Sequence, residues 1–150
     1  MSNKWDLRFL DVARLVASWS KDPSTKVGAI IVDKERHPVS VGYNGLPADM
    51  LDDPALLNNR ELKYKYVIHA ERNAIENSPC SVNGCTIYVT HPCCSRCVDF
   101  IIECGISRVV FEETSDVRFT KSWNSELAVE KLRTANIDVT ILKQNPTEEN

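Results

Sequence analysis

Apolar residues recur at three- and four-residue steps over positions 5–20, which predicts an amphipathic helix. The positions that share this spacing are Trp5, Phe9, Val12, Ala13, Val16 and Trp19. The segment 22–24 contains a proline between polar residues and ends the pattern, because such residues favour turns. Two short runs rich in β-branched residues follow at 27–32 and 38–43, and the polar turn between them indicates a hairpin.

The remainder of the chain alternates apolar strands with helices. We expect the stretch 44–67 to be mostly loop with one helical turn near 55–57, and the polar tail 144–150 to be disordered. Between them the pattern predicts helices at 70–77, 95–104 and 125–135 and strands at 86–90, 108–111 and 139–142. This alternation is typical of parallel strands, so we expect an α/β fold in which helices cover both faces of a mixed sheet. Ligand sites in such folds lie at the carboxyl ends of the strands.

Composition narrows the range of functions. The length of 150 residues allows one compact domain, which we expect over 1–143. There are 18 Lys and Arg against 21 Asp and Glu, a net charge of −3, and no basic stripe, so polymeric nucleic acid is disfavoured as a partner and a single nucleotide is not. The sequence has no secretory signal and no apolar run of membrane-spanning length, so we expect a cytoplasmic protein without membrane association.

Cysteines cluster in the second half of the chain, at Cys80, Cys85, Cys93, Cys94, Cys97 and Cys104. In a reducing compartment such clusters bind metal or perform redox chemistry more often than they form disulfides. Two motifs at predicted helix starts, H-A-E at 69–71 and C-S-R-C at 94–97, supply one imidazole and two thiolates. Zinc prefers four ligands, so His69, Cys94 and Cys97 would leave its fourth position to water, as in catalytic sites. Glu71 would stand beside that water and transfer its proton.

Two adjacent cysteines leave the register of the second motif open. Paired with Cys97, Cys94 gives a spacing of two residues that suits two ligands in the first turn of a helix, whereas Cys93 gives a spacing of three. We therefore select Cys94 and leave Cys93 as a bystander or an oxidation-sensitive thiol. A structural zinc site that uses four cysteines, including Cys80 and Cys85, is the main alternative, and a redox C-x-x-C pair is another.

Four segments, taken in order, resemble the deoxycytidylate deaminases, a branch of the zinc-dependent cytidine deaminase superfamily. They are D-P-S-T-K-V-G-A at 22–29, G-Y-N-G at 42–45, the H-A-E segment at 63–75, and the second-cysteine helix at 97–106. The resemblance spans about residues 5 to 142. It implies a three-layer α/β/α cytidine-deaminase-like fold and the zinc-dependent deamination of dCMP to dUMP, with release of ammonia and supply of dUMP for thymidylate synthesis.

The resemblance also implies roles for individual residues. His69, Cys94 and Cys97 would bind zinc, and Glu71 would shuttle the proton. Residues expected to bind substrate are Lys26 in the nucleotide pocket, Asn44 at the sugar and the backbone of Ala70 at the base. A regulatory site for the activator dCTP or the inhibitor dTTP, with Mg²⁺ beside the triphosphate, would involve Gly42, Tyr43, Asn44, Gly45 and Asn73. The family is typically a homohexamer.

Other functions remain compatible with these motifs. A tRNA adenosine deaminase would need a basic surface, which an isoelectric point near 5.6 disfavours. A cytidine or deoxycytidine deaminase would need no phosphate pocket. A non-catalytic zinc- or nucleotide-binding protein would not require Glu71 beside the metal. The G-Y-N-G segment by itself also fits an ordinary Asn-Gly turn.

Overall fold

The computed structural model describes residues 4–23, 25–46, 58–59, 68–113 and 125–143. Within these ranges the elements follow the order α1 (Lys4–Ala17), β1 (Gly28–Val32), β2 (Pro38–Tyr43), α4 (Ala70–Glu76), β3 (Thr86–Val89), α5 (Ser95–Glu103), β4 (Arg108–Glu112), α6 (Ser125–Thr134) and β5 (Asp138–Leu142). The helical turn expected near 55–57 and the tail at 144–150 lie outside the described residues. Of the helices described, none has the length and apolar character needed to span a bilayer.

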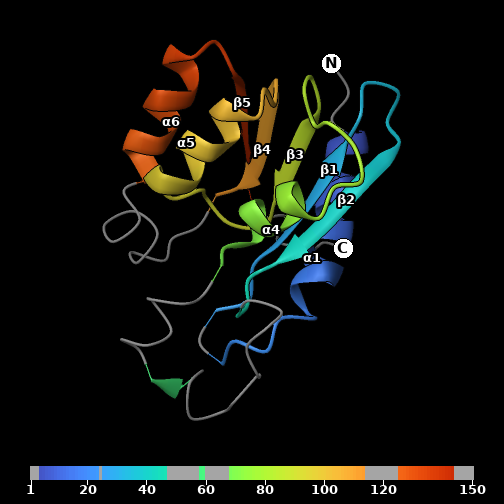
Figure 1. The fold of residues 1–150 in the computed structure, drawn as a ribbon, viewed down its shortest axis with the longest axis vertical. Helices are drawn as coiled ribbons and strands as arrows, with labels where there is room; N and C mark the ends of the chain where they lie inside the picture. Colours follow the sequence, from blue (N-terminus) through green and yellow to red (C-terminus); the bar gives the residue numbers. More distant parts are fainter. Residues whose placement is uncertain (1–3, 24, 47–57, 60–67, 114–124, 144–150) are drawn as a thin grey trace.

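The five strands form one mixed sheet in the order β2–β1–β3–β4–β5. Strand β1 pairs antiparallel with both β2 and β3, while β3, β4 and β5 are parallel to one another. Helix α1 packs on one face of the sheet, and α4, α5 and α6 cover the other (Figure 1). The predicted three-layer α/β/α architecture and the β1–β2 hairpin are therefore confirmed.

Strand β1 lies inside the sheet and is buried along its whole length. Ile30 and Val32 pack with the buried side of α1, whereas Ala29 and Ile31 belong to the larger core beneath α4 and α5. Helices thus cover both faces of this strand. That is the physical reason why its sequence is continuously apolar instead of alternating between apolar and polar residues.

Helix α1 buries a face that is rotated from the predicted one. Phe9, Ala13 and Val16 are buried as expected, together with Leu10 and Ala17. Trp5 and Val12 are 37% exposed and Trp19 is 49% exposed. The cause is a close approach to the sheet at Gly28, where an added Cβ would lie 2.0 Å from the Ala13 carbonyl oxygen and 2.5 Å from the Ala17 nitrogen. Only a helix face of small residues can come this near, so the larger side chains turn outward.

Two ion pairs fasten α1 to the two ends of β4. The Arg108 guanidinium donates to both oxygens of Asp6 at 2.9 and 2.7 Å, and Arg14 donates to both oxygens of Glu112 at 3.1 and 2.6 Å. The two pairs have matching spacings along the helix and the strand. The eight-residue step from Asp6 to Arg14 rises about 12 Å, and the four-residue step from Arg108 to Glu112 spans about 13 Å. The Tyr88 hydroxyl also donates to Asp6 at 2.9 Å. Burial alone would raise the pKa of Asp6, but the hydrogen bonds from Arg108 and Tyr88 outweigh it and lower that pKa below 3.8.

We predict that Asp6→Asn destabilises the fold by about 2 kcal/mol at neutral pH, because Arg108 loses its two short carboxylate contacts and keeps only the longer one with Asp138 at 3.5 Å. Asp11→Asn is the matched control, since Asp11 is 74% exposed and pairs with Arg14 on the same helix; its effect should stay within about 0.5 kcal/mol. The free energy of unfolding in urea measures both.

The pH dependence of the difference in unfolding free energy between the wild type and Asp6→Asn tests the same ion pair, Asp6–Arg108. The pKa of Asp6 is lower in the folded than in the unfolded protein, so its stabilisation is present above pH 3.8 and is lost as the pH falls through the folded value. The difference in unfolding free energy between the wild type and Asp6→Asn should therefore become smaller only below that pH. Equal stability of the Asp6 and Asp11 variants at neutral pH would contradict the assignment.

Candidate active site

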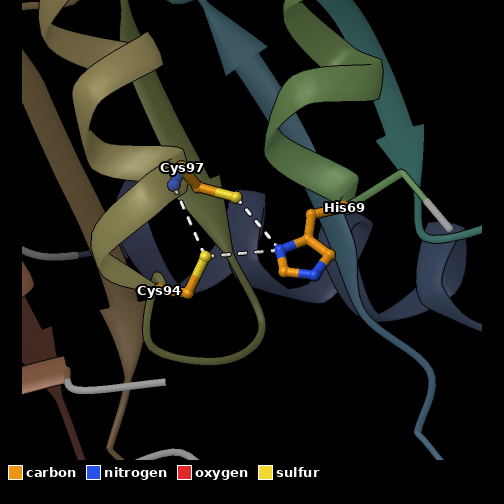
Figure 2. A group of neighbouring side chains, drawn as sticks. All are labelled: His69, Cys94 and Cys97. Atoms are coloured by element: carbon orange, nitrogen blue, oxygen red, sulfur yellow. Dashed lines mark hydrogen bonds between the residues drawn. The ribbon is translucent and has the colours of Figure 1, made fainter. Parts of the chain in front are cut away.

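The residues of the predicted metal site meet at the edge of the sheet where the parallel strands end. His69 directly precedes α4, and Cys94 directly precedes α5 with Cys97 in its first turn. His69 and Cys94 both have extended backbone, with φ and ψ of −73° and 158° and of −81° and 159°. Figure 2 shows the imidazole at the start of α4 facing the two sulfurs at the start of α5.

The ligand atoms are close enough to share one ion. His69 Nδ1 lies 3.1 Å from Cys97 Sγ and 3.4 Å from Cys94 Sγ, and the three atoms all lie within 4.8 Å of one another (Figure 2). Tetrahedral zinc holds nitrogen and sulfur ligands roughly 3.6 Å apart. The described group therefore fits zinc with little movement of the side chains.

Among the described residues, one other group could hold a metal by proximity, Asp33, Glu35 and His37 in the turn between β1 and β2. His37 pairs with Asp33 there and its side chain is largely exposed. Cys80 and Cys85 belong to neither group, Cys80 being exposed and Cys85 buried. The structural site of four cysteines is therefore not formed.

The two metal-site cysteines differ in how readily they ionise. The hydrogen bond from Cys97, together with His69, lowers the pKa of Cys94 to about 4 against the opposing effect of burial. The same hydrogen bond to Cys94, with burial, raises the pKa of Cys97. Burial opposes the charge on His69, but the Cys94 sulfur and the Glu71 carboxylate raise its pKa on balance. One thiolate thus already exists at neutral pH beside a protonated partner, and metal binding would release that proton.

Glu71 lies in the first turn of α4, two residues after His69, and is 1% exposed. Burial, the largest influence, raises its pKa, while the nearby His69 lowers it. Its Oε2 atom has no hydrogen-bond partner among the described residues. A buried oxygen without a donor costs about 1–3 kcal/mol unless something else binds it. The position beside the ligand group points to a polar group held at the metal.

The structure gives Asn44 a definite set of partners. Its Oδ1 accepts from the Val27 backbone N–H at 2.9 Å, and its Nδ2 donates to the Thr25 carbonyl at 2.9 Å and to Asp22 at 3.4 Å. The side chain therefore holds the turn that leads into β1. The neighbouring residue Gly45 forms a two-way backbone bridge with the residue before His69, which keeps Asn44 close to the metal group.

The remaining expected substrate residues also gather near this edge. Lys26 is exposed and lines a cavity of about 300 Å³ together with Thr90 and His91, which follow β3. The Thr90 hydroxyl accepts from the Gly28 backbone N–H at 3.1 Å and lies 2.8 Å from His91 Nδ1. Ala70 is fully buried as the first residue of α4, where a backbone N–H has no partner within the helix.

The residues expected at a regulatory site form a junction between β2 and α4. Asn73 Nδ2 donates to the Tyr43 carbonyl at 2.7 Å. Gly42 lies directly against the helix, since an added Cβ would be 2.3 Å from the Ala74 nitrogen. The Tyr43 ring is 40% exposed and meets the Trp19 ring edge-on at 6.3 Å. This arrangement explains Gly42 and Asn73 as packing residues, whatever else they bind.

Cys93 is the functional candidate that the sequence left unassigned. It is 1% exposed, and its sulfur is not part of the metal group. Burial and the neighbouring Glu71 raise its pKa well above the ordinary value. Its nearness to Glu71 could not be read from the sequence, because the two residues lie 22 positions apart and meet only when α4 and α5 pack together.

Comparison with known proteins identifies the family of the chain. The model for the zinc-binding region of cytidine and deoxycytidylate deaminases matches residues 3–113. The chain belongs to this deaminase family. A deaminase from the luxG 3' region of Aliivibrio fischeri is 44% identical over 145 residues, covering 95% of this chain and 96% of that protein. The deoxycytidylate deaminase of Homo sapiens is 43% identical over 114 residues, covering 72% of this chain but only 64% of the human protein.

Solved structures agree on the fold of the deaminase chain. The dCMP deaminase of cyanophage S-TIM5 superposes with a TM-score of 0.72 at 23% identity, covering 95% of this chain and all of that one. Its complex with dCMP and dUMP gives a TM-score of 0.71. The deaminase fold is thus confirmed. In a family with a zinc-binding region, the group of one imidazole and two cysteines fits zinc as its metal.

We predict that Cys94→Ala abolishes stoichiometric zinc binding, because two ligands with no third protein donor hold the ion weakly. Cys80→Ala is the control, since Cys80 is an exposed cysteine outside the group. Elemental analysis of purified protein after dialysis should give about one zinc per chain for the wild type and the control, and a small fraction of that for Cys94→Ala. Full zinc content in Cys94→Ala would show that Cys94 is not a ligand.

Proposed function

We propose that this protein hydrolyses dCMP to dUMP and ammonia, with zinc held by His69, Cys94 and Cys97. The observation that carries the proposal is the Glu71 carboxylate, buried beside the ligand group with one oxygen that has no donor among the described residues. A purely structural zinc site needs no such carboxylate, and three protein ligands leave one coordination position open. The deoxycytidylate deaminases among its relatives support the choice of dCMP as substrate.

The chemistry divides between the metal and Glu71. Bound zinc would supply the Lewis acidity that makes a water molecule acidic enough to attack near neutral pH. Glu71 accepts a proton from the attacking water and delivers it to the ring nitrogen N3 as C4 is attacked. It then takes the second proton from the hydroxyl now bonded to C4 and passes it to the amino group; the C4–N bond breaks as the C4 carbonyl forms, so water and the cytosine ring give uracil and ammonia. Burial favours this role, because it raises the pKa of Glu71 and lets the carboxyl keep the proton between steps.

Substrate binding would use the groups around this edge of the sheet. The Ala70 backbone N–H would bind the base, and the remaining lone pair of Asn44 Oδ1 would accept from the sugar hydroxyl. Lys26 is the cation we assign to the nucleotide phosphate, because it lines the cavity beside His91. Arg14 also lines this cavity, but its guanidinium is already paired with the carboxylates of Asp11 and Glu112.

Regulation is a further part of the proposal. Residues Gly42, Tyr43, Asn44, Gly45 and Asn73 would receive dCTP as activator or dTTP as inhibitor, with Mg²⁺ beside the triphosphate. What supports this site is its connection to the catalytic helix, since Asn73 links Tyr43 to α4, the helix that begins next to His69 and carries Glu71. A cytoplasmic homohexamer of one domain over 1–143, supplying dUMP for thymidylate synthesis, completes the proposal.

We predict that Glu71→Gln keeps zinc and lowers kcat on dCMP by about 10²–10⁴-fold, because the amide cannot accept the water's proton. The control is Glu76→Gln on the same helix, where the carboxylate is exposed and pairs with Arg72; it should keep wild-type activity. The loss of cytosine absorbance measures turnover on dCMP, dCTP, deoxycytidine and cytidine. If the wild-type protein holds zinc but converts none of these compounds, the proposed deaminase activity is wrong. If it prefers a nucleoside, the proposed nucleotide substrate is wrong.

The assignment of Lys26 to the phosphate makes a separate prediction. Lys26→Gln should raise KM for dCMP by about tenfold, the equivalent of one lost charged contact, and leave KM for deoxycytidine unchanged. Lys34→Gln offers a matched control, because this lysine lies near Gly84 at the opposite edge of the sheet. An equal rise in KM for the nucleotide and the nucleoside would assign Lys26 to folding of the pocket instead of the phosphate.

A further inference from the structure

Three buried polar residues from two segments form a connected group at the proposed sugar position. Ser20 and Asp22 lie between α1 and β1, and Asn44 directly follows β2. The Ser20 hydroxyl donates to the Asn44 carbonyl at 2.8 Å and accepts from the Asp22 backbone N–H at 3.2 Å. Hydrogen bonds between buried polar groups are strong and costly to break, so this group holds its members in fixed positions.

The Asp22 carboxylate connects the turn before β1 to the Asn44 side chain. Its Oδ1 accepts from the Thr25 backbone N–H at 3.2 Å, and its Oδ2 accepts from Asn44 Nδ2 at 3.4 Å. The same Nδ2 donates to the Thr25 carbonyl at 2.9 Å. Asp22 therefore acts on the Asn44 amide directly, and also through the turn residue whose carbonyl binds that amide.

These hydrogen bonds determine which way the Asn44 amide faces. Both hydrogens of Nδ2 are used, by the Thr25 carbonyl and the Asp22 carboxylate, while Oδ1 accepts from the Val27 backbone N–H at 2.9 Å. An amide oxygen has two lone pairs. Within the described part of the chain, the second lone pair of Oδ1 is therefore the capacity that the amide has left. It can bind a donor such as a hydroxyl, and not an acceptor.

We propose that Asp22 is a positioning residue that fixes the Asn44 amide with its oxygen toward the 3′-hydroxyl of the nucleotide, and thereby makes the enzyme select substrates that carry this hydroxyl. The inference rests on the proposed function, in which Asn44 binds the sugar. In dCMP the 5′ oxygen carries the phosphate and position 2′ has no hydroxyl, so the 3′-hydroxyl is the donor that the sugar offers. A site built around a hydroxyl rejects an analogue that lacks it, because its own polar group is then left without a partner.

The ratio of kcat/KM for dCMP to that for 2′,3′-dideoxycytidine 5′-monophosphate, which lacks the 3′-hydroxyl, measures this role. We expect the wild type to favour dCMP at least about tenfold. Asp22→Asn keeps an oxygen for the Thr25 N–H but turns an NH2 group toward the NH2 group of Asn44. The ratio should fall to about threefold or less, through loss of activity on dCMP, while activity on the dideoxy analogue stays within about twofold of the wild type. A ratio that stays at the wild-type value overturns the proposal.

Other substitutions separate positioning from stability. Asp6→Asn removes another buried carboxylate, which binds Arg108 near the start of α1; it should lower the melting temperature and leave the ratio unchanged. Asn44→Ala removes the amide itself and sets the lower limit of the ratio. If Asp22→Asn does not fold, Asp22→Ser takes its place, since a serine hydroxyl also accepts from a turn N–H but is too short to reach Asn44. An equal loss of activity on both substrates shows that Asp22 only stabilises the fold and overturns the proposal.

Nuclear magnetic resonance of the Asn44 side-chain amide tests the contact without substrate. Its two proton signals are assigned by their absence in Asn44→Ala. In the wild type both protons should exchange slowly with water, because both are hydrogen-bonded in a buried place, and in the Asp22 variant exchange should become at least about tenfold faster. Exchange that is equally slow in the wild type and the variant overturns the contact. Because this readout needs no substrate, a failure of dCMP deamination and a failure of the Asp22–Asn44 contact are distinguished.

Discussion

Helix α4 rests directly on strand β2 because Gly42 has no side chain. An added Cβ would meet the backbone of the helix at 2.3 Å from the Ala74 nitrogen and 2.6 Å from the Ala70 carbonyl oxygen. His69 and Glu71 are attached to this helix, so the depth at which it lies on the sheet decides whether they reach the cysteines at the start of α5. Metal ligands tolerate errors of only a few tenths of an ångström. The close approach at Gly42 thus sets the geometry of the whole site.

Several ionisable side chains lie close together at this buried site, where little water can reach them. The Cys94 thiolate and the Glu71 carboxylate repel each other, and both negative groups raise the pKa of His69. In a medium of low dielectric such repulsion is costly. Burial raises the pKa of Glu71, and the hydrogen bond from Cys97 lowers that of Cys94. A divalent cation at the ligand group would relieve the repulsion between the two groups. Burial and the nearby Glu71 also raise the pKa of Cys93.

The opposite face of the sheet supplies rigidity. Helix α1 reaches the sheet at Gly28 and is fixed at both ends of β4 by Asp6–Arg108 and Arg14–Glu112. Arg14 and Glu112 also line the cavity that contains Lys26, so the second ion pair borders the proposed phosphate position. The same two residues, Arg14 and Glu112, therefore both fix α1 to the sheet and line the proposed binding surface. The cluster of motifs at this edge consequently depends on helix packing on both faces of the sheet.

The sequence by itself determined the order of the elements, the hairpin and the metal triad. The strands and the later helices end within one or two residues of their predicted limits, because hydrophobic periodicity is a local property. The choice of Cys94 over Cys93 was also local, since spacing along one helix turn selects the residue that faces His69.

Only the tertiary structure decided how the buried side chains are used. The buried face of α1 follows from Gly28, which is eleven residues beyond the end of that helix at Ala17. Asn44 binds the turn before β1, and Cys93 is buried in the main core. These partners are set by close approach between segments distant in the chain, and no pattern within a single segment encodes such a distance.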